Sequence, residues 1–322
     1  MTHVNLAFGL IQDGTVTLEK LTHLDLLPRF RQWNPDIHIV LSIGGWGAGG
    51  FSEMARTEEG RRRFALSCRR AVDVYGLDGI DIDWEYPCSS LAGIDADPSD
   101  RENFTLLLRA LRDALGDHLL SVAVGASTEF VRSTQMDQVA SIVDYVQIMT
   151  YDLRSGFSHQ AGHHAALGAS SGDMTNLNTK DVVEMFHSAG VPLEKTVIGA
   201  AFYGRIWKGV RKENNGLLQP AATVGLTGPR YSEIDEDYLN SHRFVQYWDA
   251  DAQAAYLWNG EEFVSFESVE AVRLKCAFVR ERGLLGIMYW EHGCDPSGEL
   301  LRAIDEALHS PSVRKMHSAK QP

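Results

Sequence analysis

The spacing of apolar residues limits the possible folds of this chain more than any other feature of its sequence. Short runs of β-branched and other apolar residues alternate with longer windows in which apolar residues recur every three or four positions. Strands that alternate with helices in this way form a mainly parallel sheet covered by helices. Seven strands fit either a doubly wound sheet or a (β/α)8 barrel with one unit unrecognised. The runs are Val4–Leu10, Ile37–Ile43, Ile80–Trp84, Leu119–Val124, Tyr145–Tyr151, Val197–Ala201 and Leu285–Trp290.

A glycine-rich turn after the second run argues against a cofactor-binding version of this fold. The turn from Ser42 to Gly47 reads SIGGWG. It lacks the GxGxxG spacing of dinucleotide-binding proteins and has the bulky Trp46 where a pyrophosphate would approach. We therefore expect no nucleotide cofactor.

One segment of about 80 residues breaks the alternation of strands and helices. It contains three apolar and aromatic runs, and Asn259-Gly260 between the last two predicts a β-hairpin. We therefore expect an α+β insertion at residues 203–283, within a barrel domain formed by residues 1–202 and 284–309. The polar, unpatterned residues 310–322 are expected to be a disordered tail.

Composition excludes several classes of protein. The 322 residues include 30 Lys and Arg against 43 Asp and Glu, which gives a net charge of −13. No run approaches the ~18 apolar residues of a membrane helix, and an acidic chain is poorly suited to nucleic acid, whose phosphates attract basic surfaces. The four scattered cysteines do not form a disulfide framework and are expected to be buried. The first residues show no signal-peptide pattern, so the chain as written is expected to be cytoplasmic.

The segment Asp78–Pro87, DGIDIDWEYP, carries the clearest chemical signal. Because side chains alternate along a strand at about 3.3 Å per residue, Asp81, Asp83 and Glu85 share one face at steps of about 6.6 Å. The apolar residues between them face the other way. The sequence therefore predicts three carboxylates in a row on one side of a strand.

Three explanations fit this row of acids. Charges can protect an exposed edge strand, but helices cover both faces of a parallel sheet. Carboxylates can hold a cation, but no HExxH motif, histidine pair or EF-hand spacing accompanies them. Clustered carboxylates also raise one another's pKa, so that one stays protonated near neutral pH and can donate to a leaving group. We favour this acid/base explanation and expect no metal, because Glu85 ends the strand where barrel active sites are built.

Five motifs together resemble glycoside hydrolase family 18, the chitinases. DGIDIDWEYP is similar to the family's DxxDxDxE signature at all four acidic positions, Asp78, Asp81, Asp83 and Glu85. The insertion resembles the family's α+β chitinase insertion domain, and the resemblance covers about residues 2 to 308. It implies a TIM barrel with the insertion between its last two strands. The other matching segments, in family order, are Leu41–Trp46, Gln147–Asp152, Ala201–Arg205 and Gly286–Trp290.

The resemblance also implies a mechanism and a set of site residues. Family members cleave β-1,4-linked N-acetylglucosamine polymers with retention, using the substrate's own acetamido group as nucleophile. Glu85 would protonate the glycosidic oxygen and later activate water. Asp83 would hydrogen-bond the acetamide N–H, Asp81 would share a proton with Asp83, and Tyr151 would donate its hydroxyl to the acetamido oxygen. Trp290 would form the floor under the sugar.

Other residues are implied to bind the sugar or to support the motif. The substrate-binding candidates besides Trp290 are Asp152, Met149, Gln147, Tyr203, Arg205, Trp46 and Tyr86. The candidates for structural support are Asp78, Gly79 and Ser42. The partner implied is chitin or a chitooligosaccharide, and we expect a monomer without cofactor, nucleic acid or membrane. Family members are expected to be secreted.

Two other functions share the acidic motif. Lectin-like relatives bind chitin without cleaving it, but they typically lose the glutamate or its neighbouring aspartate, which this chain keeps. An endo-β-N-acetylglucosaminidase acting on N-glycans is the second, although the insertion favours long chitin chains.

The chain differs from the family at its start. Val4–Phe8 resembles the family's second strand, so the fold expected here is a (β/α)8 barrel lacking its first strand.

Overall fold

A computed structural model describes residues 1–240 and 243–309 of the chain. The tail predicted at 310–322 lies outside the described residues.

Seven parallel strands form the central sheet, and all seven predicted runs are among them. Their order across the sheet is β1-β3-β4-β5-β6-β7-β13, and β2 pairs antiparallel with the end of β1. The sheet curls as in a barrel, and Phe8 of β1 stacks on Trp290 of β13 with 5.3 Å between ring centroids. Among the described residues no strand lies between β1 and β13. The strands are β1 His3–Gln12, β2 Thr15–Thr17, β3 His38–Gly44, β4 Gly79–Asp83, β5 Leu119–Gly125, β6 Tyr145–Met149, β7 Thr196–Ala201 and β13 Gly286–Trp290.

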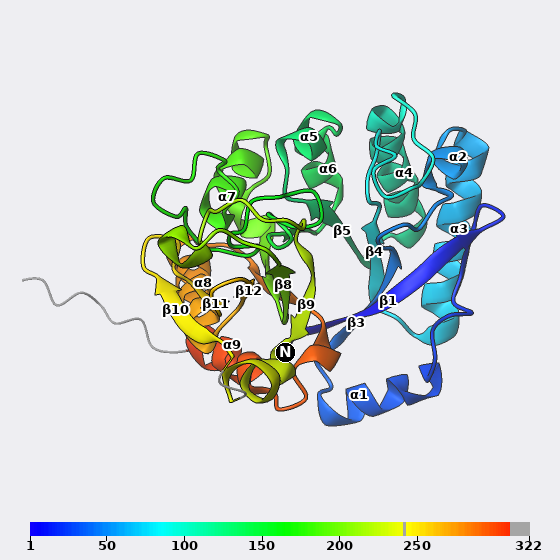
Figure 1. Ribbon diagram of the computed structural model, residues 1–322. Helices are drawn as coiled ribbons and strands as arrows, with labels where there is room; N and C mark the ends of the chain where they lie inside the picture. Colours follow the sequence, from blue (N-terminus) through cyan, green and yellow to red (C-terminus); the bar gives the residue numbers. More distant parts are fainter. Residues whose placement is uncertain (241–242, 310–322) are drawn as a thin grey trace, which may run out of the picture.

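Helices surround the sheet on its outer side (Figure 1). At α3 the ends follow ordinary capping chemistry: the Thr57 side chain accepts the Gly60 N–H at its start, and Gly76 ends it in the left-handed conformation. No helix in the described part of the chain is both long and apolar enough to cross a membrane. The helices are α1 Leu27–Trp33, α2 Phe51–Ala55, α3 Glu58–Tyr75, α4 Asp100–Leu115, α5 Thr128–Arg132, α6 Met136–Ile142, α7 Thr179–Ser188, α8 Val269–Arg282 and α9 Glu299–His309. Short 3-10 turns are at Leu24–Leu26, Leu193–Lys195, Glu213–Gly216, Tyr231–Glu233 and His292–Cys294, and a π-helix is at Ile234–Leu239.

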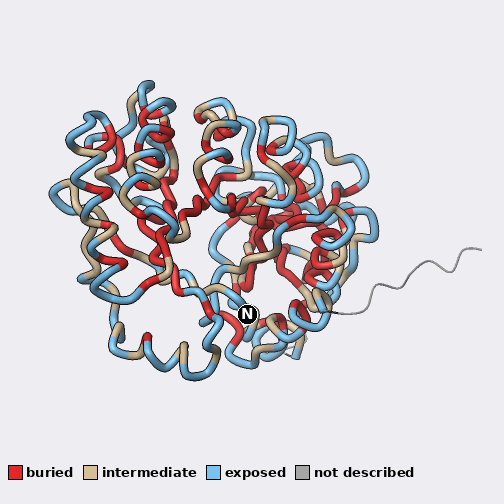
Figure 2. Tube along the Cα trace, turned by 180° about the vertical axis from the view of Figure 1, so that it is seen from behind, coloured by how far each residue is buried: buried red, intermediate tan, exposed pale blue. Residues whose placement is uncertain are grey.

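The main apolar core lies between the sheet and the outer helices. Ile80, Ile82 and Trp84 of the acidic segment belong to it, and each is at most 1% exposed. Figure 2 shows the buried residues gathered along the strands and on the helix faces that meet them. Burying one such side chain stabilises the fold by roughly 1.5–3 kcal/mol. This core fixes the orientation of β4 and so turns its acids to the other face. Three of the cysteines are buried and Cys88 is partly exposed.

A second, antiparallel sheet follows β7 in the chain. Its order is β10-β11-β12-β8-β9, and the hairpin predicted at Asn259-Gly260 joins β11 to β12. Phe278 and Val279 of α8 pack with Ile198 of β7, so this helix covers the parallel sheet. The strands are β8 Tyr203–Trp207, β9 Leu226–Arg230, β10 Val245–Asp249, β11 Ala254–Trp258 and β12 Phe263–Phe266.

Candidate active site

The three predicted acids lie together at the carboxyl end of β4. Asp81 and Asp83 are in the strand, and Glu85 follows two residues after its end. Their exposed fractions are 1%, 5% and 9%. A row of nearly buried carboxylates is unfavourable unless each group is hydrogen-bonded or protonated.

Hydrogen bonds hold Asp81 in place. Its Oδ2 accepts from Ser42 Oγ at 2.7 Å, and its Oδ1 accepts from Ser121 Oγ at 2.7 Å and from Gln147 Nε2 at 2.9 Å. Burial raises the pKa of Asp81, and the three hydrogen bonds oppose this rise. The donors come from three neighbouring strands, so Asp81 ties β3, β5 and β6 to β4.

Gln147 differs from its predicted role. It was expected to line the sugar site, but its side chain is 6% exposed and its amide group donates to Asp81. Its Oε1 accepts from Asn5 Nδ2 of β1 at 3.4 Å. Gln147 is thus a support for the acidic row. Its amide group donates to the same Asp81 oxygen as the Ser121 hydroxyl.

Asp83 is the least satisfied of the acids. Its Oδ1 is buried and finds no hydrogen-bond partner among residues 1–240 and 243–309. Burial, then the charge of Glu85, then that of Asp81 raise the pKa of Asp83 well above its usual range. A buried acceptor without a donor is rare in a native protein and points to a group supplied from outside.

Glu85 has the pKa of a group that changes protonation near neutral pH. Burial raises the pKa of Glu85 to about 7, a hydrogen bond with the Tyr86 side chain lowers it, and the charge of Asp152 raises it. A carboxyl group with such a pKa can donate a proton at neutral pH and take one back. The acids titrate as a coupled set.

Tyr151 and Asp152 follow β6 and reach the same end of the sheet. The Tyr151 hydroxyl lies 3.8 Å from Met288 Sδ, and the Tyr151 ring meets the Tyr203 ring edge-on at 6.2 Å between centroids. Burial raises the pKa of Tyr151 well above its usual range, as do Tyr203 and the nearby acids, so the hydroxyl stays protonated. Tyr151 is therefore a hydrogen-bond donor beside the acidic row.

Asp152 is held by an arginine. Arg205 Nε and Nη2 each donate to one of its carboxylate oxygens at 2.6 Å, and the buried His164 lies 3.5 Å away. Burial alone would raise the pKa of Asp152, but His164 and Arg205 together bring it well below its usual range. Arg205 and Tyr203 belong to β8 of the antiparallel sheet, at the start of the predicted insertion. The second sheet therefore contributes directly to the site.

The predicted aromatic residues include three near the carboxyl ends of the strands. Trp290 is 36% exposed and Trp46 is 57% exposed. Trp46 meets Tyr86 edge-on at 6.3 Å, and Trp290 lies on Phe8. Exposed rings beside buried acids provide flat surfaces on which a sugar can stack. Met149, in contrast, is buried at the end of β6.

The predicted supporting residues hold β4 both at its start and beside the acidic row. Asp78 Oδ2 accepts from Arg31 Nη2 at 3.0 Å and from the Ile39 N–H at 2.6 Å, below the acidic row. A Cβ on Gly79 would lie 2.2 Å from the Leu119 carbonyl oxygen, so only glycine fits there. Ser42 contacts Asp81 directly.

Ser121 was missed in the sequence. Its register places it beside Asp81 on one side, as Ser42 is on the other. A single serine inside the apolar run LLSVAVG of β5 was the available signal.

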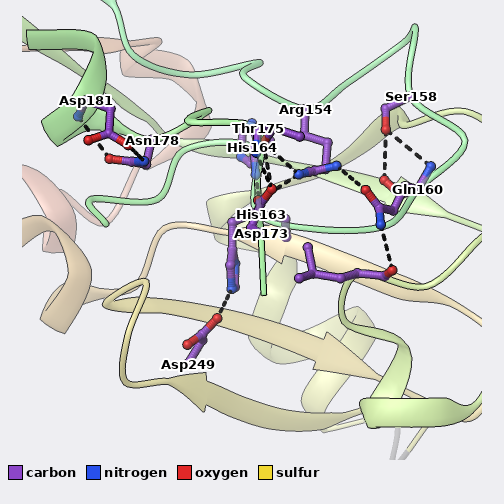
Figure 3. A network of polar contacts seen from close by, with 12 residues as sticks. Arg154, Ser158, Gln160, His163, His164, Asp173, Thr175, Asn178, Asp181 and Asp249 are labelled. Carbon is purple, nitrogen blue, oxygen red and sulfur yellow. Dashed lines mark hydrogen bonds and ion pairs between the residues drawn. The ribbon is translucent and has the colours of Figure 1, made fainter. Parts of the chain in front are cut away.

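The loop between β6 and α7 was also missed (Figure 3). Arg154, two residues after Asp152, donates to Gln160 Oε1 and Asp173 Oδ2, both at 2.7 Å. His163 Nε2 lies 3.2 Å from Asp249 Oδ2 of β10. These contacts anchor the loop beside Asp152 and join it to the antiparallel sheet.

Fold and site together define the class of protein. The described residues contain no group of three His, Cys, Asp or Glu side chains arranged to hold a metal ion. A barrel-type sheet whose carboxyl end carries buried acids, one with a pKa near neutrality, and exposed tryptophans has the site of a glycoside hydrolase.

Comparison with known proteins gives the family. The model of "Glycosyl hydrolases family 18" matches residues 1–295, and the chain belongs to this family. It is 34% identical over 294 residues to Chitinase A1 of Niallia circulans, which covers 84% of this chain and 42% of that protein. The chain thus spans less than half of that relative's length.

Solved structures of the family share the whole fold. One is a glycoside hydrolase family 18 N-acetylglucosaminidase from Paenibacillus barengoltzii, with a TM-score of 0.94 and 45% identity, covering 96% of this chain and 93% of that one. Another is the Ostrinia furnacalis group IV chitinase in complex with allosamidin, with a TM-score of 0.88 and 30% identity, covering 95% and 90%.

Proposed function

We propose that this glycoside hydrolase cleaves β-1,4-N-acetylglucosamine linkages of chitin or chitooligosaccharides with retention, through an oxazolinium intermediate. The observation that carries the proposal is the acidic row of β4: a fixed Asp81, an Asp83 with an unsatisfied oxygen, and a Glu85 with a pKa of about 7. This arrangement supplies a proton donor and a hydrogen-bond acceptor on one wall. It fits a reaction in which the substrate provides the nucleophile.

Each acid has a distinct task in the proposed reaction. Glu85 is protonated in a large share of molecules at neutral pH, so it protonates the glycosidic oxygen and then, as a carboxylate, activates water. The open Oδ1 of Asp83 accepts the acetamide N–H and turns the acetamido oxygen toward the anomeric carbon. Asp81 has its oxygens occupied by donors, so it acts on Asp83 through its charge.

Tyr151 and Trp290 complete the proposed site. The Tyr151 hydroxyl, kept protonated by its environment, donates a hydrogen bond to the acetamido oxygen and so orients this oxygen toward the anomeric carbon. Trp290 stacks under the sugar at the cleavage point, supported from below by Phe8. The Ostrinia chitinase, which shares this fold, has been solved in complex with allosamidin, and this supports a ligand-binding role for the shared fold.

A second candidate is an N-acetylglucosaminidase that releases single sugars. It is favoured by the 45% identity and nearly complete mutual coverage with the Paenibacillus barengoltzii enzyme. The two candidates share the chemistry of the acidic row and differ in which bond of the polymer they cleave.

The products of chitohexaose separate these candidates. Early products limited to N-acetylglucosamine and chitopentaose support the N-acetylglucosaminidase, whereas early chitobiose with chitotetraose, or chitotriose, supports the chitinase. Binding without any product supports a lectin-like protein and refutes both.

The substrate-assisted step has its own test. A fluorogenic chitobioside should be cleaved, and the same compound without its acetyl groups should not be, even at concentrations that fill the site. Equal rates on both would refute the participation of the acetamido group.

A further inference from the structure

A buried ion pair lies against the strand that supports Tyr151. Lys275 of α8 pairs with Glu267, which precedes that helix, through Nζ and Oε1. The side chains are 1% and 2% exposed. Neither belongs to the acidic row, and nothing in the proposed reaction uses them.

Both partners also bind the backbone of β7. Lys275 Nζ donates to the Gly199 carbonyl oxygen at 3.1 Å, and Glu267 Oε1 accepts the Ala201 N–H at 3.3 Å. The register between β6 and β7 ends at Ile198. The ion pair therefore holds the part of β7 that its neighbour β6 no longer holds by regular pairing.

Gly199 is the residue on which Tyr151 rests. A Cβ there would lie 2.7 Å from Tyr151 Cε1, so the ring packs directly on the glycine. Thr150 exchanges two hydrogen bonds with Gly199, of 2.9 and 2.8 Å, through its hydroxyl. On the other side Gly199 pairs with Met288, whose sulfur lies near the Tyr151 hydroxyl. The position of Gly199 thus sets the position of Tyr151.

Stability alone does not account for two charges in this place. Desolvation of a buried ion pair offsets most of its attraction, and apolar residues of similar volume often stabilise a fold as well or better. The pair does, however, hydrogen-bond a carbonyl and an N–H two residues apart on β7, and it thereby ties both backbone groups to α8 and the segment before it.

We propose that Lys275 and Glu267 are positioning residues, which fix Tyr151 through Gly199 for its contact with the acetamido oxygen. The inference rests on the proposed function, because the role of Tyr151 is part of it.

The test is a coupling experiment with a fluorogenic chitobioside. The double variant Glu267→Leu/Lys275→Met leaves no buried charge unpaired, and circular dichroism verifies its fold. We expect kcat to fall about tenfold or more with KM within about twofold, because a small displacement of a reacting group is costly. In a Tyr151→Phe background the same double change should lower kcat by less than about twofold, because the effects of residues that act through one another are not additive. Glu267→Gln/Lys275→Met is the milder alternative if the first variant does not fold.

An ion pair beside another strand, with side chains 26% and 41% exposed, provides a control because it also binds a backbone N–H. Asp144 Oδ2 accepts from Arg112 Nη2 at 2.7 Å and from the Leu120 N–H at 2.8 Å, at the amino end of β5. Arg112→Met/Asp144→Leu should lower the melting temperature and leave kcat unchanged. The inference is overturned if the double change Glu267→Leu/Lys275→Met leaves kcat unchanged, or if its loss of kcat multiplies with that of Tyr151→Phe. A wild-type protein without turnover refutes the proposed function instead.

Discussion

The pKa of Glu85 predicts how the stability of the fold depends on pH. In the folded chain burial raises the pKa of Glu85 from 4.5 to about 7. Between these values the folded protein binds a proton that the unfolded chain does not, so the free energy of unfolding falls as pH rises. Each pH unit of this interval is worth about 1.4 kcal/mol, which gives about 3 kcal/mol in total. The stabilisation is fully present below pH 4.5 and lost as pH rises through about 7.

Glu85→Gln removes this contribution. Urea unfolding at intervals from pH 4.5 to 8 would give the free energy of unfolding of both proteins. We expect the variant to gain about 3 kcal/mol relative to the wild type across that range. Asp95→Asn, at an exposed carboxylate, controls for the loss of one negative charge and should follow the wild type in parallel. A difference between Glu85→Gln and wild type that does not change with pH would refute the reasoning about burial.

Three further changes test other parts of the site. Ser121→Ala removes one hydrogen-bond donor from the buried Asp81, so urea unfolding should show a free energy of unfolding lower by about 1–3 kcal/mol. An unchanged unfolding midpoint would contradict the hydrogen-bond network. Gly199→Ala places a Cβ 2.7 Å from the Tyr151 ring, so kcat should fall about tenfold to a hundredfold while circular dichroism stays native. Full activity would show that the ring has room to move. Dialysis against EDTA should leave the rate on a chitobioside unchanged, because the proposed reaction uses carboxyl groups, the Tyr151 hydroxyl, water and the substrate's own acetamido group. A loss restored by a divalent cation would reopen the metal explanation.

The parallel strands could be predicted because each is a local pattern. Every predicted run forms a strand, since an apolar segment flanked by helical windows has few other ways to be buried. The alternation in DGIDIDWEYP likewise placed Ile82 in the core and the acids opposite. The family resemblance then joined the scattered motifs into one site.

The contacts between distant segments could not be predicted in this way. Gln147 was predicted as a site residue and Ser121 was missed, and the sequence could not show that both donate to Asp81, because the register between strands sets those contacts. Arg205 lies on β8, where the insertion was predicted to begin, but its ion pair with Asp152 depends on how the two sheets meet and cannot be predicted from sequence periodicity. From the sequence alone Lys275 would be expected to lie exposed on its helix, because nothing in the sequence shows that Glu267 lies beside it.

The central claim is that Glu85 is the proton donor of a glycosidase. Its most direct test is the turnover of a fluorogenic chitobioside by the wild type and by Glu85→Gln, both with native circular dichroism and both able to bind the sugar. The account predicts release of the fluorophore by the wild type and a loss of kcat of about a hundredfold or more in the variant. Equal rates in the two proteins would contradict the assignment of Glu85.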